Sequence, residues 1–183
     1  MHNKKASCQQ EGFTLIEMMI VVAIVAIILS LAVPSFNDFF EKNRLKRATE
    51  AVYGLVVSAK AESAMRDADM QVTINAGEWC VGYATTANCN CTLSNPSAVG
   101  ACAVPVAGTD VLKVVDGLDF PDVTLATNYG ASVAFNRLRG TAPGGTLNFV
   151  SGNWQLDLVI SNEGRLRLCV PAGATATLGY PSC

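Results

Sequence analysis

The chain has 183 residues, of which 50% are hydrophobic and 15% charged, so it is too apolar for a disordered chain and suits one compact domain with an accessory segment. Its net charge of −2 gives no general attraction for nucleic-acid phosphates, so a nucleic-acid role would need a local basic patch. The single histidine, His2, precedes the first apolar segment. Ser-His-Asp and Cys-His catalysis are therefore excluded, and we do not expect an enzyme.

The first apolar segment, residues 13–33, reads FTLIEMMIVVAIVAIILSLAV and carries one charge, Glu17. As a helix it would span about 30 Å, the thickness of the hydrocarbon core of a bilayer. Lys4 and Lys5 precede it, which by the positive-inside rule leaves the N-terminus in the cytoplasm and sends the C-terminal body across the membrane. The sequence therefore predicts a single-pass membrane helix.

Two general interpretations of this segment leave Glu17 unexplained. One is a conventional signal peptide cut after the small residues Ser30 and Ala32, and the other is an uncleaved anchor helix. A carboxylate within a membrane span costs a few kcal/mol, so by default it indicates a function or a partner.

A third interpretation explains Glu17. The segment QQEGFTLIEMM resembles the prepilin processing motif of type IV pilins and type II secretion pseudopilins, over residues 1–34. The resemblance implies that residues 1–12 are a leader, that a prepilin peptidase cuts after Gly12, and that the new amine of Phe13 is methylated. Cleavage would leave a net charge of −3, because it removes Lys4, Lys5 and Glu11. In a filament, the carboxylate of Glu17 can then meet the ammonium group of a neighbouring subunit, so that two costly charges compensate each other.

The helical pattern continues beyond Pro34, where we expect a kink because proline removes a backbone hydrogen bond. Apolar residues recur at spacings of three and four as far as about Arg66, which predicts an amphipathic helix with one buried face. Residues 13–34 form the transmembrane half of the helix in this interpretation, and 35–68 the amphipathic half.

Beyond Met70 the period changes to two, and residues 69–183 are expected to form a β-rich domain in the periplasm or outside the cell. The predicted fold class is α+β, a long N-terminal α-helix packed on an antiparallel β domain. The predicted strands are 71–75, 79–84, 111–116, 123–126, 132–136, 146–150, 155–161 and 165–170. Residues 88–108 show no clear pattern and are predicted to be a loop held by disulfides.

Six cysteines follow the leader, and an even number in an exported domain predicts three disulfides: Cys80, Cys89, Cys91, Cys102, Cys169 and Cys183. Their spacing is not that of a zinc site, so we expect no metal and no cofactor. We expect Cys169 to pair with Cys183. Since Cys89 and Cys91 are too close to pair comfortably with each other, they would then take Cys80 and Cys102, in an order that stays open.

The C-terminal half, with VAFNRLRG followed by WQLDLVISNEGRLRLC, resembles the GspH/FimT family of minor pilins and minor pseudopilins. The resemblance implies a low-abundance subunit, anchored in the bacterial inner membrane and then carried at a filament tip, that primes or caps assembly with other pilin subunits. The six cysteines favour a FimT- or FimU-like type IV pilus subunit over a minor pseudopilin of a type II secretion system. A subunit for surface adhesion through the disulfide-held loop is a further alternative.

The segment GRLR ends this family-like region. On a strand, Arg165 and Arg167 project together from one face, opposite Leu166 and Leu168, and two adjacent guanidinium groups can contact successive phosphates. The motif resembles the GRxR of FimT-like pilins that bind DNA in natural transformation, which implies a DNA-binding tip pilin as an alternative function. The plainer interpretation is a solvated strand face, neutralised by the nearby acids Glu163 and Asp157. Arg137 and Arg139 are candidates to extend the patch.

Overall fold

The computed structural model describes residues 12–175 and 179–183, with the side chains of 31–35 left out. The predicted leader residues 1–11, with Lys4 and Lys5, lie outside the described part. The chain divides into two compact units, Met1–Phe39 and Phe40–Cys183.

The first unit contains the N-terminal part of helix α1 (Leu15–Met65). The hydroxyl of Thr14 accepts a hydrogen bond from the backbone N–H of Glu17 at 3.3 Å, as an N-cap does at a helix start. Helix α1 continues through Pro34, and the kink expected there stays a prediction. Within the part of the chain that the structure describes, no helix is long and apolar enough to cross a membrane.

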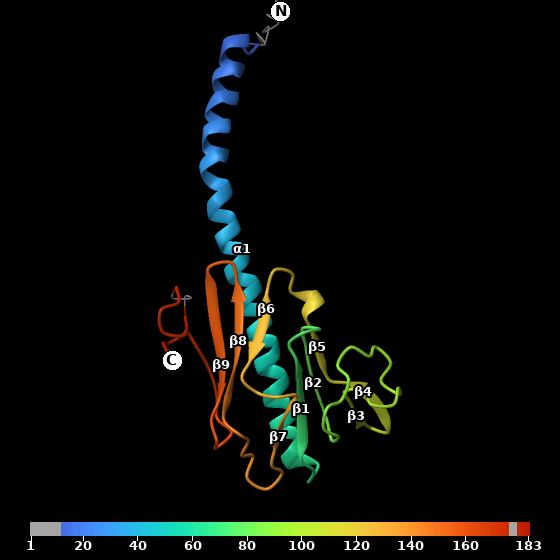
Figure 1. The fold of residues 1–183 in the computed structure, drawn as a ribbon. Helices are drawn as coiled ribbons and strands as arrows, with labels where there is room; N and C mark the ends of the chain where they lie inside the picture. The colour runs from blue at the N-terminus through green and yellow to red at the C-terminus, as the bar shows by residue number, and fades with distance from the viewer. Residues whose placement is uncertain (1–11, 176–178) are drawn as a thin grey trace, which may run out of the picture. The chain divides into compact units, whose positions relative to one another are not determined.

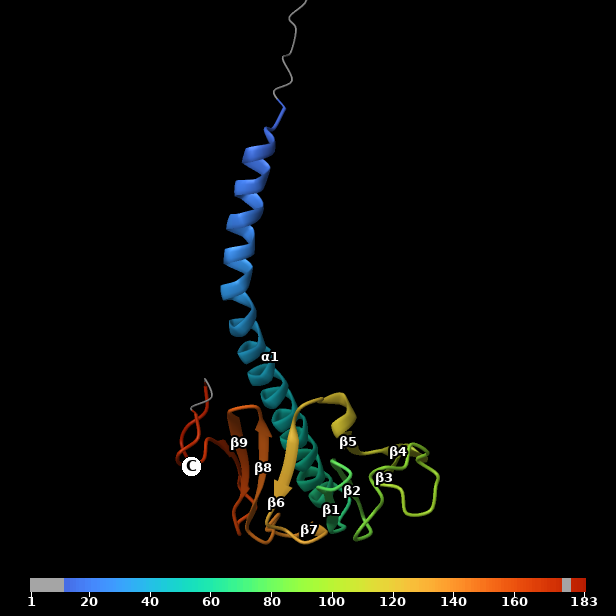
Figure 2. The ribbon, with the colours of Figure 1, turned by 45° about the horizontal axis from the view of Figure 1, so that its top comes forward.

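The second unit contains the rest of α1 and two four-stranded antiparallel sheets, which lie in front of the helix in Figures 1 and 2. One sheet has the order β5-β2-β1-β7, with β5 Val114–Asp116, β2 Cys80–Ala84, β1 Met70–Asn75 and β7 Ser132–Phe135. The other has the order β10-β9-β8-β6, with β10 Leu166–Cys169, β9 Trp154–Ile160, β8 Gly145–Ser151 and β6 Thr124–Thr127. A separate hairpin joins β3 (Ala103–Val106) to β4 (Thr109–Leu112), and η1 (Gly117–Asp119) is a 3₁₀ turn.

The core lies between α1 and the two sheets. The buried stripe of α1 follows the predicted spacing of three and four: Leu45, Ala48, Val52, Val56 and Ala59. Its partners come from both sheets, among them Val72, Tyr83, Leu147, Phe149, Leu156 and Leu158. A long helix packed on antiparallel sheets confirms the predicted α+β fold class.

The predicted helix and strands agree with the structure except at two places. The predicted strand 111–116 is two strands, because the chain passes from the β3–β4 hairpin into the first sheet at Lys113. Residues 88–108 are not entirely a loop, since they contain β3. The turn of that hairpin holds Ala107 and Gly108 at positive φ values of 50° and 84°. An alanine rarely adopts this conformation, so the sequence carries only a weak turn signal here.

Three disulfides hold the β domain. Cys80 pairs with Cys91 and Cys89 with Cys102, which assigns the order that the sequence leaves open. These four cysteines are buried together in a small cluster of their own with Ala84. The third bond joins Cys169 at the end of β10 to Cys183. The presence of disulfides agrees with the prediction of a cysteine-stapled domain.

Candidate functional site

The N-terminal end of α1 carries the predicted processing and assembly residues. Gly12 and Phe13 precede the helix in an exposed stretch, and the side chain of Phe13 is 76% exposed. Glu17 lies in the first helical turn and is also exposed. Large apolar side chains are exposed along the following turns: Met18, Met19, Ile20, Val21, Val22, Ile24, Val25, Ile27, Ile28 and Leu29. Such a surface needs an apolar environment or apolar partners, because contiguous exposed hydrophobic patches are unfavourable in water.

The turn before β10 positions the GRLR segment. Gly164 has a φ of +69°, and a Cβ atom there would collide with the backbone carbonyl of Gly140, so both the conformation and the space favour glycine. The carbonyl of Gly164 accepts a hydrogen bond from Nζ of Lys60 on α1 at 2.8 Å. The start of β10 is thus tied to α1.

The register of β10 against β9 decides where its side chains point. Leu166 pairs with Ile160 and Leu168 with Leu158, and both leucines are partly buried against the core. Arg167 pairs with Val159, which places it on the opposite face, and Arg165 is one strand period away. Both arginines are exposed on the outer face of the sheet.

The acids near the arginines do not neutralise them by direct ion pairs. Asp157 is 9% exposed, and its carboxylate accepts a hydrogen bond from Nδ2 of Asn148 at 2.5 Å. Burial raises the pKa of Asp157, and the hydrogen bond from Asn148 offsets only part of this effect. The pKa of Glu163, which is fully exposed, is lowered first by hydrogen bonds to Ser161 and the backbone and then by the charge of Arg165. Arg167 donates from Nη2 to the backbone carbonyl of Cys183 at 3.2 Å.

The other two predicted arginines differ from each other. Arg137 forms an ion pair with Asp67 at 3.5 Å, and its backbone N–H donates to Asp69, so its charge is already engaged elsewhere. Arg139 is exposed in the loop whose next residue, Gly140, packs against Gly164. Lys60 was not predicted from the sequence, because it is separated from Gly164 by 104 positions along the chain, which leaves no local signal.

Two hollows flank Arg165. One, of about 350 Å³, lies between α1 and the start of β10 and is lined by Tyr53, Val57, Lys60, Gly164, Arg165 and Leu166. The other, of about 370 Å³, lies over the outer face and is lined by Val159, Ser161, Arg165, Leu166 and Arg167. Apolar and basic side chains therefore meet at this edge of the sheet.

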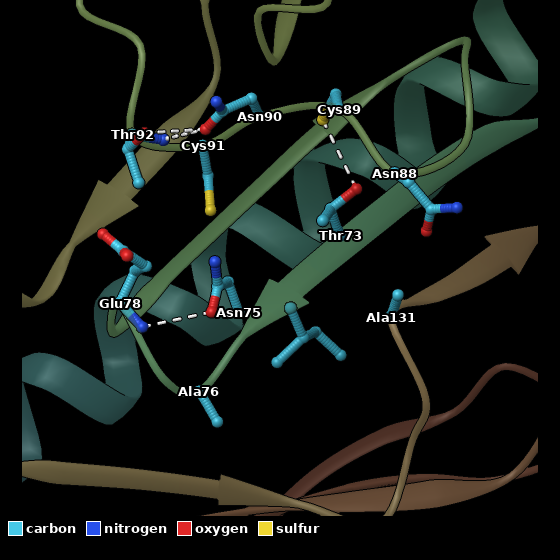
Figure 3. A pocket seen from close by; sticks show the side chains of 11 residues that line it. Thr73, Asn75, Ala76, Glu78, Asn88, Cys89, Asn90, Cys91, Thr92 and Ala131 are labelled. Atoms are coloured by element: carbon cyan, nitrogen blue, oxygen red, sulfur yellow. Dashed lines mark hydrogen bonds between the residues drawn. The ribbon is translucent and has the colours of Figure 1, made fainter.

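A polar pocket of about 460 Å³ lies beside the disulfide-held loop (Figure 3). The side-chain oxygen of Asn75 accepts a hydrogen bond from the backbone N–H of Glu78, and that of Asn90 accepts two from Thr92. The hydroxyl of Thr73 lies 3.4 Å from the disulfide sulfur of Cys89, where the hydroxyl is the only possible donor. These groups hold the loop itself, and the adhesion alternative gains no support from them. Across the described residues, no group of three or more His, Cys, Asp or Glu side chains could hold a metal ion.

Part of the chain is similar in sequence to known proteins. The chain is similar to a fimbrial protein of Pseudomonas aeruginosa, with 42% identity over 52 residues, and to the type IV major fimbrial protein FimA of Dichelobacter nodosus, with 42% identity over 48 residues. These matches cover 28% and 26% of the chain. The chain spans about a third of the length of these relatives, 34% and 30%.

Two solved structures are similar to this chain. The chain matches the type IV minor pilin FimU of Pseudomonas aeruginosa with a TM-score of 0.52 and 18% identity, over 71% of this chain and 91% of FimU. It also matches the minor pseudopilin EpsH from the type 2 secretion system of Vibrio cholerae with a TM-score of 0.49 and 12% identity, over 69% of this chain and 97% of EpsH. The FimU match supports the pilin-like fold.

Two family models match the sequence itself. The prokaryotic N-terminal methylation motif matches residues 8–33, and the type II transport protein GspH matches residues 48–170, which is more than half of the chain. Members of this group are pilin and pseudopilin subunits, which are not enzymes, as the sequence predicts. The chain belongs to the GspH family of type IV pilin-like proteins.

Proposed function

We propose that this protein is a minor pilin that primes or caps the assembly of a type IV pilus. The observation that carries the proposal is the N-terminal helix, which matches the N-terminal methylation motif and exposes apolar side chains along its length. Such a helix is stable in a bilayer or against the helices of neighbouring subunits, and a filament offers the second environment once the subunit leaves the first.

Processing prepares the helix for this transfer. A prepilin peptidase in the membrane cuts after Gly12, and the resulting amine of Phe13 becomes methylated. The cut removes Lys4 and Lys5, which hold the N-terminus on the cytoplasmic side. It also creates an ammonium group four residues before Glu17. In parallel helices with an axial stagger, the carboxylate of one subunit then meets the ammonium group of the next.

The location follows from the same segment. Residues 13–34 anchor the chain in the inner membrane as a single pass, and residues 69–183 lie in the periplasm, where the disulfides can form. The filament then carries the subunit to its tip. A minor pseudopilin of a type II secretion system is the runner-up, and the six cysteines of the body favour the pilus.

The test compares two acids on either side of the cut. Glu17→Ala and the matched Glu11→Ala are introduced into the full chain in a strain that lacks the native copy. Cleavage and methylation are measured by mass, and assembly is measured as the number of pili and the amount of the subunit in sheared filaments. We expect both variants to be inserted and processed. We expect only Glu17→Ala to lose assembly, because Glu11 leaves with the leader.

Three outcomes would contradict the proposal. Normal assembly of Glu17→Ala would show that assembly does not need the charge pair. An uncut chain in a strain with active peptidase would show that the chain is not processed after Gly12. A deletion strain with normal pili and impaired protein secretion would place the subunit in a pseudopilus instead.

DNA binding is a second candidate function, supported by the exposed, adjacent side chains of Arg165 and Arg167. Its test is binding of a labelled DNA duplex to the full chain in detergent at several salt concentrations. Each lost phosphate contact should lower the slope of log affinity against log salt by about one. Arg165→Ala and Arg167→Ala should each do so, whereas Arg47→Ala, an exposed arginine on α1, should not. Equal binding by all variants would exclude this function for the GRLR segment.

A further inference from the structure

Strand β10 is at the edge of its sheet, and part of its backbone is open. The backbone N–H of Ser161 donates to the carbonyl of Arg165, so Arg165, Arg167 and Cys169 direct their backbone groups toward β9. The N–H and C=O groups of Leu166 and Leu168 therefore point away from β9. Among the described residues, these four groups have no recorded hydrogen-bond partner.

The open stretch has defined ends. At one end, Nζ of Lys60 donates a hydrogen bond to the carbonyl of Gly164. At the other end, Val170 donates to the carbonyl of Pro181 and accepts from the N–H of Cys183, so the C-terminal tail takes the position of a neighbouring strand. We call residues 165–168 the open edge. Because the residues on both sides of it already have partners, only a short extended segment can pair with it.

The two faces of the open edge differ in chemistry. On the inner face, the apolar side chains of Leu166, Tyr53 and Val57 line the hollow between β10 and α1 together with the cations Lys60 and Arg165, and Val57 is 40% exposed. On the outer face, Arg165 and Arg167 are exposed without an ion-pair partner among the described side chains. A strand added here would place alternate side chains on these two faces.

We propose that the open edge of β10 binds an extended segment of a partner subunit in which apolar and acidic side chains alternate. The segment adds a fifth strand to the sheet β10-β9-β8-β6, antiparallel to β10, as all neighbours in this sheet are. Its apolar side chains lie over Tyr53 and Val57, and its acidic side chains meet Arg165 and Arg167. That the segment comes from a partner subunit rests on the proposed role in assembly. The binding of such a segment to the open edge does not depend on that role.

A protein strand fits this edge better than a nucleic acid does. Strand addition satisfies backbone donors and acceptors together, whereas a phosphate backbone presents acceptors and no matching row of N–H donors. In the hollow against α1, Tyr53, Val57 and Leu166 also suit an aliphatic side chain, although Lys60 and Arg165 beside them could attract either an acidic side chain or a phosphate. The arginines alone would suit either ligand, so the test must separate backbone pairing from charge.

The experiment uses a fluorescent, end-capped seven-residue peptide with valine at every second position and aspartate between. Its binding to the full chain in detergent is measured by anisotropy. N-methylation of the valines blocks the N–H groups that would pair with Leu166 and Leu168, so we expect affinity to fall at least about fivefold. N-methylation of the aspartates is the matched control, because their N–H groups point away from β10, and we expect little change.

Variants of the protein test the two faces. Val57→Asp should abolish binding by placing a charge in the hollow, whereas Val99→Asp, at a fully exposed position in the disulfide-held loop, should not. Arg165→Ala with Arg167→Ala should weaken binding about fivefold, as should replacement of the aspartates by lysine. Circular dichroism verifies that each variant is folded.

Three results would overturn the proposal. These are equal affinity of the two N-methylated peptides, unchanged affinity of Val57→Asp, or displacement by a DNA duplex with no dependence on N-methylation. The last result would show that the open edge is part of a nucleic-acid-binding surface. Because binding is measured on the isolated chain, failure here is distinguishable from loss of assembly in Glu17→Ala, and either can occur without the other.

Discussion

Glu62 is a buried carboxylate on α1 that contacts β2 and the residue between β4 and β5. It is 8% exposed and accepts hydrogen bonds from Nε of Arg66 and from the hydroxyl of Tyr83, the latter at 3.2 Å. Nζ of Lys113, in the link between β4 and β5, lies 3.4 Å from it. A single side chain therefore connects α1, β2 and the link between β4 and β5.

The cost of Glu62→Ala can be worked out from these contacts. The hydroxyl of Tyr83 is buried and would lose its acceptor, which costs about 1–3 kcal/mol. The side chains of Arg66 and Lys113 are 28% and 27% exposed, so water can solvate them when the acid is gone. Each lost ion pair then adds at most about 1 kcal/mol. We expect a total of roughly 2–4 kcal/mol and a fall in melting temperature of about 10 °C.

The assay is thermal unfolding of the full chain followed by near-ultraviolet circular dichroism, which reports on Trp79 and Trp154 in the β domain. Glu78→Ala, an exposed acid in the β1–β2 turn, is the control and should change stability by less than about 0.5 kcal/mol. A double-mutant cycle with Tyr83→Phe should give a clear coupling energy, because both changes remove the same hydrogen bond. A loss below about 0.5 kcal/mol for Glu62→Ala, or no coupling to Tyr83, would refute the assigned role of this cluster.

The pH dependence gives an independent check. Burial alone would raise the pKa of Glu62, but the hydrogen bonds from Arg66 and Tyr83 and the charges of Arg66 and Lys113 outweigh it, so the pKa lies below its ordinary value of 4.5. A folded-state pKa below the unfolded one stabilises the fold above the unfolded pKa, and this stability is lost as pH falls through the folded pKa. The difference in stability between the native chain and Glu62→Ala should therefore shrink in acid.

Three further changes test other parts of the β domain by the same unfolding assay. Asp157→Asn should raise stability at neutral pH, because burial raises the pKa of Asp157 and asparagine keeps an acceptor for Asn148. The gain in stability should vanish below about pH 4, where the carboxyl group is protonated in the folded and unfolded chains. A loss of stability at pH 7 would contradict this explanation. Cys169→Ala with Cys183→Ala should cost about 3 kcal/mol, the entropy of a loop of this length, and an unchanged stability would argue against the bond. Gly164→Ala should cost at least about 1–3 kcal/mol because of its positive φ and its close backbone contact; tolerance would mean that the turn differs from the one described.

The parts of the fold with strong periodicity could be predicted from the sequence. The helix is predicted to end near Arg66 and ends at Met65, because the apolar stripe from Leu45 to Ala59 directly records the face that packs on the sheets. Most strands are predicted within a few residues for the same reason. The hairpin of β3 and β4 was missed in part because Val106 and Val111 are substantially exposed, so no buried face imposes alternation on the sequence.

The candidate site divides in the same way. Residues 12–17 carry a local motif that is read from neighbouring positions along the chain, so it can be recognised in the sequence. The processing and the charge pairing that it implies stay predictions. The edge at β10 depends on contacts between distant segments. The sequence placed Arg165 and Arg167 on one face by strand alternation, but Lys60 and the tail residue Pro181 reach the edge only through the tertiary fold.

An exposed edge strand in a secreted protein is usually protected against uncontrolled pairing by shortness and by positive charge, and β10 has both. Protection alone would account for Arg165 and Arg167 and for the tail that covers Val170. It would not account for the apolar side chains of Val57 and Leu166, which line the hollow beside Lys60 and Arg165, because an edge that must only repel other strands gains nothing from apolar side chains. The two arginines can serve both purposes, since they repel basic strands and attract an acidic one. Selective pairing of this kind is what a subunit that must join one neighbour at one position in a filament requires.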